Sequence, residues 1–294
     1  FFELILLITS SDDQKKIKKI KLNEIKGMIE SFSIKEEKFI DEVYYLNLGV
    51  SFNKKEIFKY LENKNIFPSI PNKKKLIFIP VLIDENKKEL LIFSDNQVYD
   101  NWNTHNESTH LIEYILPTED LEDLNLIKSK FNIIEEYDFK DITSKYSLND
   151  SIISLIFINN EEVRILSRIS INDEMILKNQ SFTNININNQ DHIKNIIKQL
   201  KIIYEDHWKQ INQINTSIKL SLNVRINASN NSKILNFEKK LNKIDLIESF
   251  SISKFNKNFV FYKIIFNGTP GNFLKTMSNS NFNFDTQNKI WKLR

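Results

Sequence analysis

The most informative absence in this chain of 294 residues is cysteine, which does not occur at all. Disulfides, thiol nucleophiles, cysteine-bound zinc and iron–sulfur clusters are therefore excluded. Glycine is also scarce, and no two of its four residues have the spacing of a Rossmann or P-loop phosphate cradle. The glycine-x-serine-x-glycine elbow of the α/β-hydrolases cannot be written with them either.

An excess of charge is missing as well. Lys and Arg number 41 against 38 Asp and Glu, which leaves a formal net charge of +3. A nucleic-acid-binding protein usually carries a dominant basic face, so we expect no nucleic-acid partner. The apolar opening Phe1–Ile8 is too short to span a bilayer. We expect no transmembrane segment in the visible chain.

The opening segment also bears on where the chain starts. Phe1–Ile8 is typical of part of an amphipathic helix, or alternatively of the end of a signal peptide's apolar core. Glu3 lies inside the segment and no small-residue cleavage site follows, which favours the helix. We expect the native N-terminus, with any targeting signal, to lie upstream.

The first third of the chain changes its hydrophobic period once. Apolar residues at three- and four-residue steps predict helix over residues 1–33. Residues 37–52 then alternate, which predicts one long strand with a slip near Gly49, such as a bulge. Asn53 is a plausible N-cap for a helix over 54–63.

The next segment has the pattern of an α/β layer. The continuous apolar run 76–83 is typical of a central strand buried on both faces, although Pro80 requires an edge position or a bulge. Further strands are predicted at 90–93 and 110–116, with helical spacing at 98–103 between them. After Pro117, Thr118 is the expected cap of a helix that starts in acidic residues.

The remaining chain predicts a strand meander, a long helix and a final module. A short helix is predicted at 138–146, the meander at 151–158, 163–171 and 175–182, and the long helix at 191–213. Beyond residue 215 the order strand, helix, strand, strand, helix, strand or hairpin matches a ferredoxin-like βαββαβ module. The predicted class is α/β (α+β), with a mixed-sheet domain followed by this module. The predicted divisions are 1–72, 73–215 and 216–294.

Four stretches carry a resemblance to a known family. They are FFELILLITSSDD, YYLNLGVSF, KKLIFIPVLIDENKKELLIFSDNQVYDNW and HLIEYILPTEDLEDLNLI. With these the chain resembles the bacterial "domain of unknown function 2066" family in its alphaproteobacterial form, which generally has glycine where Glu119 stands here. The layout of residues 75–208 is also similar to the N-terminal domain of TolB and related envelope proteins. These resemblances imply a periplasmic or envelope-associated, exported protein; they supply no activity and no catalytic residues.

The candidate binding residues cluster in the stretch from Tyr99 to Asp123. Tyr99 and Trp102 stand at helical spacing, as the lining of a pocket would, although such aromatic pairs usually belong to a core. The acids Glu119, Asp120, Glu122 and Asp123 have the oxygen ligands that Mg²⁺ or Ca²⁺ prefers. The favoured alternative is that these acids complement the positive end of a helix dipole. We therefore predict no catalytic residue, metal ligand or cofactor.

The function predicted from these observations is non-enzymatic. We expect an exported envelope protein that binds other proteins or envelope components. One alternative is a carboxylate- or metal-dependent hydrolase that uses the acids of 119–123 with His105 or His110. A second alternative is a structural subunit of an envelope assembly.

Overall fold

The computed structural model describes all residues except 105–107, 216–217 and 245. The described chain forms two compact units. One is Pro71–Trp208, and the other combines Phe1–Ile70 with Lys209–Arg294. Helices and several sheets with parallel and antiparallel pairs occur together, which confirms the predicted α/β class. Of the described helices, none is both long and apolar enough to cross a lipid bilayer.

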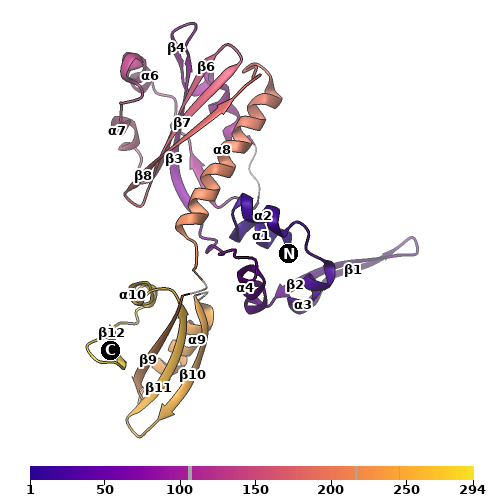
Figure 1. The fold of residues 1–294 in the computed structure, drawn as a ribbon, viewed down its shortest axis with the longest axis vertical. Coiled ribbons are helices and arrows are strands. Elements are labelled where there is room, and N and C mark those ends of the chain that lie inside the picture. Colours follow the sequence, from indigo (N-terminus) through magenta and orange to yellow (C-terminus); the bar gives the residue numbers. More distant parts are fainter. Residues whose placement is uncertain (105–107, 216–217, 245) are drawn as a thin grey trace. The chain divides into compact units, whose positions relative to one another are not determined.

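The unit Pro71–Trp208 is built on one mixed sheet with the strand order β4-β3-β6-β7-β8 (Figure 1). β5 pairs with β3 in parallel on the same edge that β4 uses further along. β6 pairs with β3 in parallel, and β6, β7 and β8 form the predicted antiparallel meander. The bounds are β3 Lys74–Asp84, β4 Glu89–Leu91, β5 Ile112–Ile115, β6 Ser151–Asn159, β7 Glu162–Ile171 and β8 Glu174–Phe182.

Helices cover both faces of this sheet (Figure 1). α8 (Gln190–Ile211), the predicted long helix, packs on one face, where its residue Tyr204 meets Phe78 of β3. Two short helices pack on the other face, where Ile127 and Ile142 join the core with the odd-numbered residues of β3. The shorter elements are η1 Phe93–Asp95, α5 Gln97–Asn101, η2 Trp102–Thr104, α6 Leu121–Ser129, η3 Phe131–Ile133 and α7 Lys140–Thr143.

β3 is the predicted central strand. Pro80 is tolerated in it because its nitrogen, which carries no hydrogen, faces a part of the edge where no strand pairs. In a parallel strand, N–H groups alternate between the two edges. Ile77 donates to the carbonyl of Asp150 on the β6 side, so the nitrogen of Pro80 faces the opposite edge. On that edge β5 pairs only as far as Ile77 and β4 begins only at Leu82, which leaves a gap in the ladder. Asn96 fills the gap by donating its Nδ2–H to the Pro80 carbonyl at 3.0 Å.

A group of three hydroxyls lies in the core between β6, β7 and α8. The Tyr204 hydroxyl is 2.6 Å from Ser154 Oγ and 2.7 Å from Ser167 Oγ, and the two serine oxygens are 3.1 Å apart. All three residues are fully buried. Burial raises the pKa of Tyr204 to about 12, against the opposing effect of the serine hydrogen bonds. The hydroxyl therefore stays neutral and satisfies both serines.

The N-terminal part of the other unit holds four helices around a small apolar core. They are α1 Phe2–Ile8, α2 Ser11–Ile17, α3 Leu22–Gly27 and α4 Lys54–Glu62. Ile5, Ile17 and Leu61 are at most 2% exposed in this core. Asn53 caps α4 as predicted, accepting from the N–H groups of Lys55 and Glu56.

Two predictions for this part were wrong. Helix was predicted through residue 33, but β1 (Ile29–Ile40) begins directly after α3, and β2 (Val43–Phe52) pairs with it antiparallel. The predicted single strand over 37–52 is therefore the far part of β1, a turn, and β2. The chain reverses at Asp41 and Glu42, whose φ values of 50° and 62° give a two-residue turn without glycine. The slip predicted near Gly49 is not found there, since Gly49 pairs with Ser33. The irregularities of the ladder lie in β1, where Glu30 and Lys35 are extra residues.

The C-terminal part of that unit forms a five-stranded sheet with the order β10-β11-β9-β13-β12. β11 lies between β9 and β10, as in a split βαβ unit, so the predicted strand and helix order is confirmed. The chain ends in a hairpin, and its second strand, β13, pairs with β9 in parallel. The bounds are β9 Lys219–Asn227, α9 Asn231–Lys243, β10 Ile247–Phe255, β11 Phe259–Asn267, α10 Pro270–Ser278, β12 Phe284–Asp285 and β13 Trp291–Leu293.

Tyr204→Phe tests the role of the buried hydroxyl group. The substitution leaves Ser154 and Ser167 with only each other, so we expect the free energy of unfolding to fall by about 1–2 kcal/mol. Urea denaturation followed by circular dichroism measures this change. Tyr45→Phe is the matched control because Tyr45 is 55% exposed, and it is expected to be neutral. Equal stability of the two variants would contradict the assigned role.

Candidate binding surfaces

The predicted acids lie in the turn between β5 and α6. A shallow depression of about 370 Å³ opens beside this turn. Its wall comes from the segment after β4 and from the start of α6, and the lining residues are Ile92, Phe93, Ser94, Asp95, Glu119, Asp120, Leu121 and Leu124. Two of the four predicted acids therefore reach a concave surface.

Asp120 is the N-cap of α6, a role that had been predicted for Thr118. Its Oδ1 accepts the N–H groups of Glu122 at 2.7 Å and Asp123 at 3.4 Å. Its Oδ2 lies 3.1 Å from Lys145 Nζ, and the same Nζ lies 2.7 Å from Asp123 Oδ1. The hydrogen bond from the Glu122 N–H and the contact with Lys145 lower the pKa of Asp120 below its usual value. This carboxylate is thus used in helix capping, as the favoured alternative predicted.

The other acids differ in their surroundings. Asp123 is 3% exposed and faces Lys145, so it is a buried partner of a lysine. Glu119 accepts the N–H of Ser94 at 3.1 Å and so ties the turn to the segment after β4. Glu122 lies exposed in the first turn of α6. The four acids consequently do not converge on one point.

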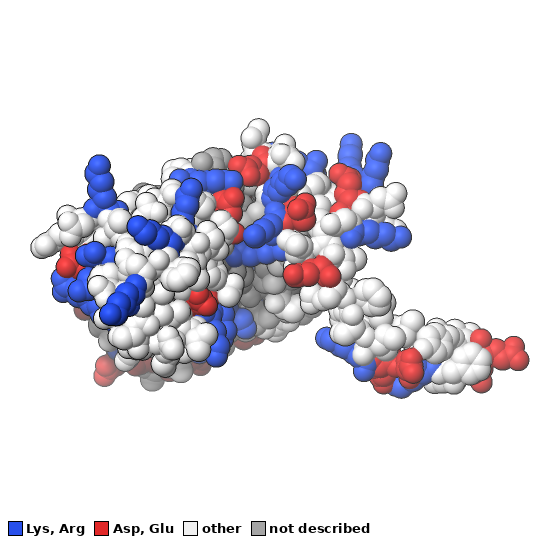
Figure 2. Space-filling model, turned by 90° about the horizontal axis from the view of Figure 1, so that it is seen from below, with Lys and Arg blue, Asp and Glu red and all other residues white. Residues whose placement is uncertain are grey.

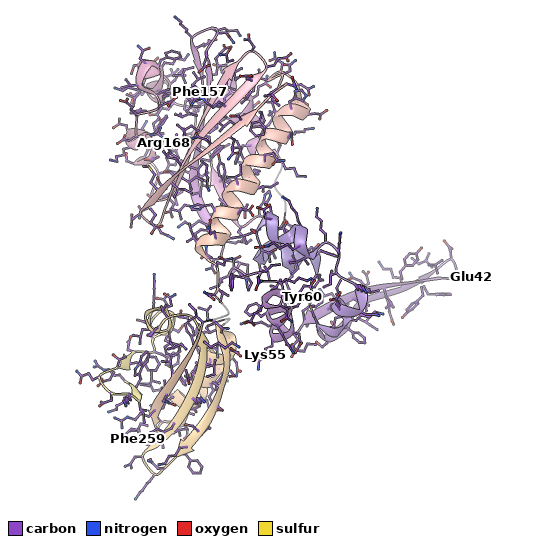
Figure 3. All side chains as sticks on the ribbon, viewed as in Figure 1. Glu42, Lys55, Tyr60, Phe157, Arg168 and Phe259 are labelled. Carbon is purple, nitrogen blue, oxygen red and sulfur yellow. The ribbon has the colours of Figure 1, made fainter. Side chains whose placement is uncertain are left out.

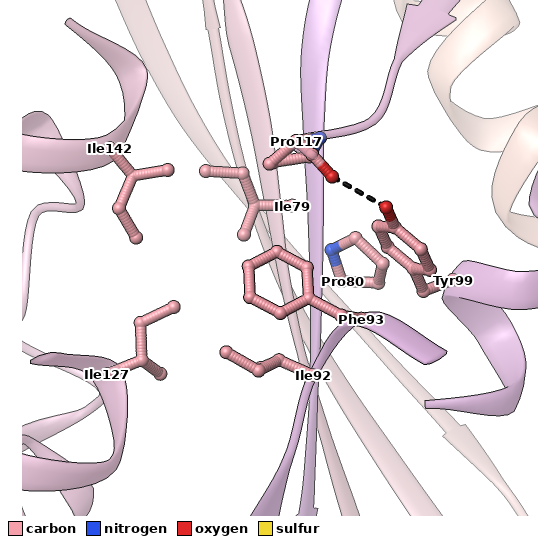
Figure 4. A pocket seen from close by; sticks show the side chains of 8 residues that line it. All are labelled: Ile79, Pro80, Ile92, Phe93, Tyr99, Pro117, Ile127 and Ile142. Atoms are coloured by element: carbon pink, nitrogen blue, oxygen red, sulfur yellow. Dashed lines mark hydrogen bonds between the residues drawn. The ribbon is translucent and has the colours of Figure 1, made fainter. Parts of the chain in front are cut away.

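Tyr99 joins the same neighbourhood from α5. Its hydroxyl donates to the Pro117 carbonyl at 2.6 Å, and its ring meets Phe93 edge-on at 5.8 Å (Figure 4). Burial, followed by the charge of Glu119, raises the pKa of this tyrosine. The cavity beneath it measures about 10 Å³, which is room for at most one water molecule. Tyr99 therefore fixes the turn that precedes α6.

Trp102 lies elsewhere, on the opposite face of the sheet. It is 0% exposed, stacks on Phe78 at 3.8 Å and meets Tyr114 edge-on at 5.2 Å. Lys201 of α8 donates to the Trp102 carbonyl at 2.7 Å, and its Nζ lies 5.3 Å from the centre of the indole ring. Trp102 is thus a core residue, and the sheet separates it from Tyr99 and the acids.

The metal ligands of the hydrolase alternative do not assemble in the described part of the chain. Among those residues, no group of three or more His, Asp or Glu side chains is placed to hold a metal ion. His110 belongs to the segment that leads into β5. His105 lies outside the described residues.

The β1–β2 hairpin is a second candidate surface, which was not predicted from the sequence. Residues paired across an antiparallel ladder share a face, so the register sorts its side chains into two sets. One set, called the apolar face from here on, contains one acid, Glu37, and otherwise only apolar or aromatic residues. Those residues are Phe32, Ile34, Phe39, Tyr44, Leu46, Leu48 and Val50.

All seven of these side chains are well exposed. Their exposed fractions run from 42% at Val50 to 72% at Phe32. Figure 2 shows the hairpin as a projecting, largely white arm with acidic residues at its end. Glu37 is the one charged residue of this face, and its Oε2 accepts a hydrogen bond from the Tyr44 hydroxyl. That bond raises the pKa of Tyr44.

The opposite face of the hairpin is polar along most of its length. It carries Ser31, Ser33, Glu36, Lys38, Asn47 and Ser51, and next to the turn also the exposed residues Ile40, Val43 and Tyr45. Gly49 belongs to this face, and the side chain of Lys35 lies across it: a Cβ there would approach Lys35 Cε to 2.8 Å. The hairpin is therefore amphipathic. The sequence contained a signal for this hairpin. Apolar residues recur at every second position, at Phe32 and Ile34 before the turn Asp41–Glu42 and from Tyr44 to Val50 after it.

Comparison with known proteins leaves the family open. No family model matches the chain. No curated protein matches it either. Among solved structures, the crystal structure of an uncharacterized protein is similar to 48% of this chain and 92% of its own, with 7% sequence identity and a TM-score of 0.20. The resemblance to the "domain of unknown function 2066" family therefore stays a prediction.

A thermal-shift series tests whether the acids at 119–123 bind metal. Because Asp120 and Asp123 already have backbone and lysine partners, we expect Mg²⁺, Ca²⁺, Mn²⁺ and Zn²⁺ to leave the melting temperature unchanged. A rise in melting temperature with one cation that disappears in Asp120→Ala would instead support the hydrolase alternative.

The Asp123–Lys145 pair is tested by Asp123→Ala. The variant loses a buried carboxylate and leaves Lys145, which is 42% exposed, with Asp120 alone. We expect unfolding to require about 1–2 kcal/mol less, below the usual cost of a fully buried pair because water screens the lysine. Chemical denaturation measures the loss. Glu122→Ala, an exposed acid of the same helical turn, is the control and is expected to change stability little.

The lowered pKa of Asp120 predicts a pH dependence. A carboxyl whose folded pKa lies below its unfolded value stabilises the fold above the unfolded pKa, near 3.9, and loses that effect as the pH falls through the folded pKa. Asp120→Asn keeps the cap and removes the charge. Its difference in stability from the unchanged chain is therefore expected at pH 7 and is expected to shrink below pH 4. A difference that does not vary with pH would contradict this assignment.

Proposed function

We propose that this protein is a non-enzymatic binding protein of the cell envelope, exported to the periplasm, and that the apolar face of the β1–β2 hairpin is its docking surface. The observation that carries the binding function is the exposure of seven large apolar side chains on one face of one hairpin. Contiguous apolar surfaces of this kind mark interaction sites on folded proteins. The envelope location rests on the family resemblance alone.

Energetics also favour a covered hairpin. A two-stranded hairpin without a packing partner is at best marginally stable in water. The apolar core of the helices of residues 1–70 includes Met28, just before β1, and meets the hairpin at Phe52, the last residue of β2. The rest of β1 and β2 has an almost uniformly exposed pattern. A partner on the apolar face would supply the burial that this part of the chain itself does not provide.

The docking surface is the face of the hairpin, and its β1 edge is protected. The extra residues Glu30 and Lys35 bulge out of β1, and both are charged. Bulges and charges on an edge strand hinder the addition of a further strand. Partner binding by strand addition to β1 is therefore disfavoured, whereas side-chain packing on the face remains open.

The alternative functions have weaker support. A hydrolase based on the acids of 119–123 needs carboxylates that are free to act, and Asp120 and Asp123 are engaged in capping and ion pairs. A structural subunit of an envelope assembly would use the same apolar face, and the identity of the crosslinked partner distinguishes that function from transient binding.

Photo-crosslinking in intact cells tests the proposed surface. A photo-reactive phenylalanine analogue replaces either Leu46, on the apolar face, or Asn47, the next residue on the polar face. We expect discrete adducts from position 46 in the periplasmic fraction and few from position 47. Equal adducts from both positions, or none from either, would remove the support for this surface.

Substitutions on the apolar face are expected to reduce binding without reducing the stability of the fold. Leu46→Asn and Leu48→Asn alter residues that are 48% and 47% exposed, so each is expected to change the free energy of unfolding of the unassociated chain by less than about 0.5 kcal/mol. If the face is a docking surface, a photo-reactive residue at Phe39 loses its adducts in these variants. A large loss of stability would show instead that the two leucines support the fold.

A further inference from the structure

The charges along the hairpin are unevenly distributed, and the distribution is self-complementary. Residues 29–52 contain five acids and two lysines. Two of the acids, Asp41 and Glu42, occupy the turn at the tip, where both are exposed (Figure 3 labels Glu42). The base carries charges of both signs: Glu24, Lys26 and Glu30 lie around the start of β1, and Lys54, Lys55 and Glu56 form the first turn of α4, after Asn53. One end of the apolar face is thus acidic, whereas the other has Lys54 and Lys55 next to the end of β2.

We infer that a second copy of this chain covers the apolar face, with the two hairpins antiparallel and related by a two-fold axis. The inference rests on the proposed function, because it names the partner of that same surface. In a two-fold interface each residue contacts its counterpart reciprocally. An antiparallel arrangement centred on Asn47 of β2 places Tyr44 against Val50 of the second copy, and Leu46 against its Leu48.

The same centre brings the charges into register. Asp41 and Glu42 lie six and five residues before Asn47. The counterpart of Asp41 across the axis is therefore Asn53 and that of Glu42 is Phe52, next to Lys54 and Lys55. The acidic tip of each copy meets Lys54 and Lys55 at the base of the other, which favours this docking geometry over others. A parallel arrangement would instead bring the four tip carboxylates together.

The area of the face is suited to a dimer. Seven side chains with exposed fractions of 42–72% amount to about 700 Å² per copy, taking about 150–250 Å² for each fully exposed side chain. Stable interfaces bury about 800 Å² per partner, so the face and its charged rim together reach that size. The carboxylate of Glu37, the one acid on the face, enters the interface with a hydrogen bond from Tyr44 already made. Its transfer away from water is correspondingly less unfavourable.

The absence of cysteine permits a direct test on the full chain. Single variants Tyr44→Cys, Leu46→Cys, Leu48→Cys and Val50→Cys introduce the only thiols in the protein. They are mixed pairwise and oxidised, and the disulfide-linked dimers are quantified on non-reducing gels. We expect the 44 with 50 and 46 with 48 mixtures to crosslink at least five-fold more than 44 with 44 or 50 with 50. Tyr45→Cys, on the opposite face, is the control and is expected to crosslink weakly.

Sedimentation and charge reversal complete the test. We expect the unchanged chain to sediment at micromolar concentration with twice the 34.9 kDa mass of one chain. Asp41→Lys with Glu42→Lys is expected to weaken the dimer at least ten-fold, and so is Lys54→Glu with Lys55→Glu. All four changes together are expected to restore most of the affinity. Melting temperatures measured in parallel verify that each variant folds.

The outcomes separate the dimer from the proposed function. A monomer at all concentrations, or preferred crosslinks of 44 with 44, would overturn the antiparallel dimer. If adducts to another protein still formed at Leu46 in cells, the docking surface would stand and only its occupant would be wrong. A monomer without adducts at Leu46 would remove both. A dimer that is unaffected by Leu46→Asn and by the charge reversals would place the interface on another surface.

Discussion

The burial of β3 on both faces is the constraint on which the unit Pro71–Trp208 depends. Its residues from Leu76 to Ile83 are all buried, so helices have to cover the sheet on both sides. Its edges are occupied as well, by β6 along one side and by β5 and β4 in sequence along the other. The gap between β5 and β4 is where Pro80 can lack a donor without loss, and Asn96 of the following segment satisfies its carbonyl.

The hairpin of β1 and β2 follows the opposite principle. Its strands are as long as β3, but neither face of this two-stranded sheet is covered along most of its length. One face is polar along most of its length, whereas the other has the composition of a protein core. A fold with well-packed cores elsewhere that leaves such a face exposed has a physical reason to associate. Function is therefore expected where packing is incomplete.

The acidic turn before α6 shows how a cluster with the composition of a metal site is used in folding. A carboxylate next to free N–H groups at a helix start is stabilised by them, and a nearby lysine neutralises its charge. Asp120 and Asp123 with Lys145 follow this rule. Tyr99 and Glu119 then hold the turn against neighbouring segments. The cluster thus explains the geometry at the end of β5 better than it explains a reaction.

Local pattern predicted the elements whose apolar faces are covered by the fold. The apolar run of β3, the meander β6–β8, the stripe of α8 and the βαββαβ order were all readable in this way. The prediction was wrong at residues 29–33, because pairing with β2 overrides an apolar spacing of three or four residues that is typical of a helix. The turn at Asp41 and Glu42 lacked the glycine that usually signals a hairpin, so one strand was predicted in place of two.

By itself, the sequence determined which chemistry is absent, which segments are helix or strand in most of the chain, and which side chains share a face. Only the tertiary structure decided which of those faces are covered. The alternation in β2 does not differ in kind from that in β7, but Ile165 and Ile169 of β7 are buried, whereas Leu46 and Leu48 are exposed. The physical reason is that periodicity assigns a side chain to one side of a strand, and what lies on that side depends on segments distant in the sequence.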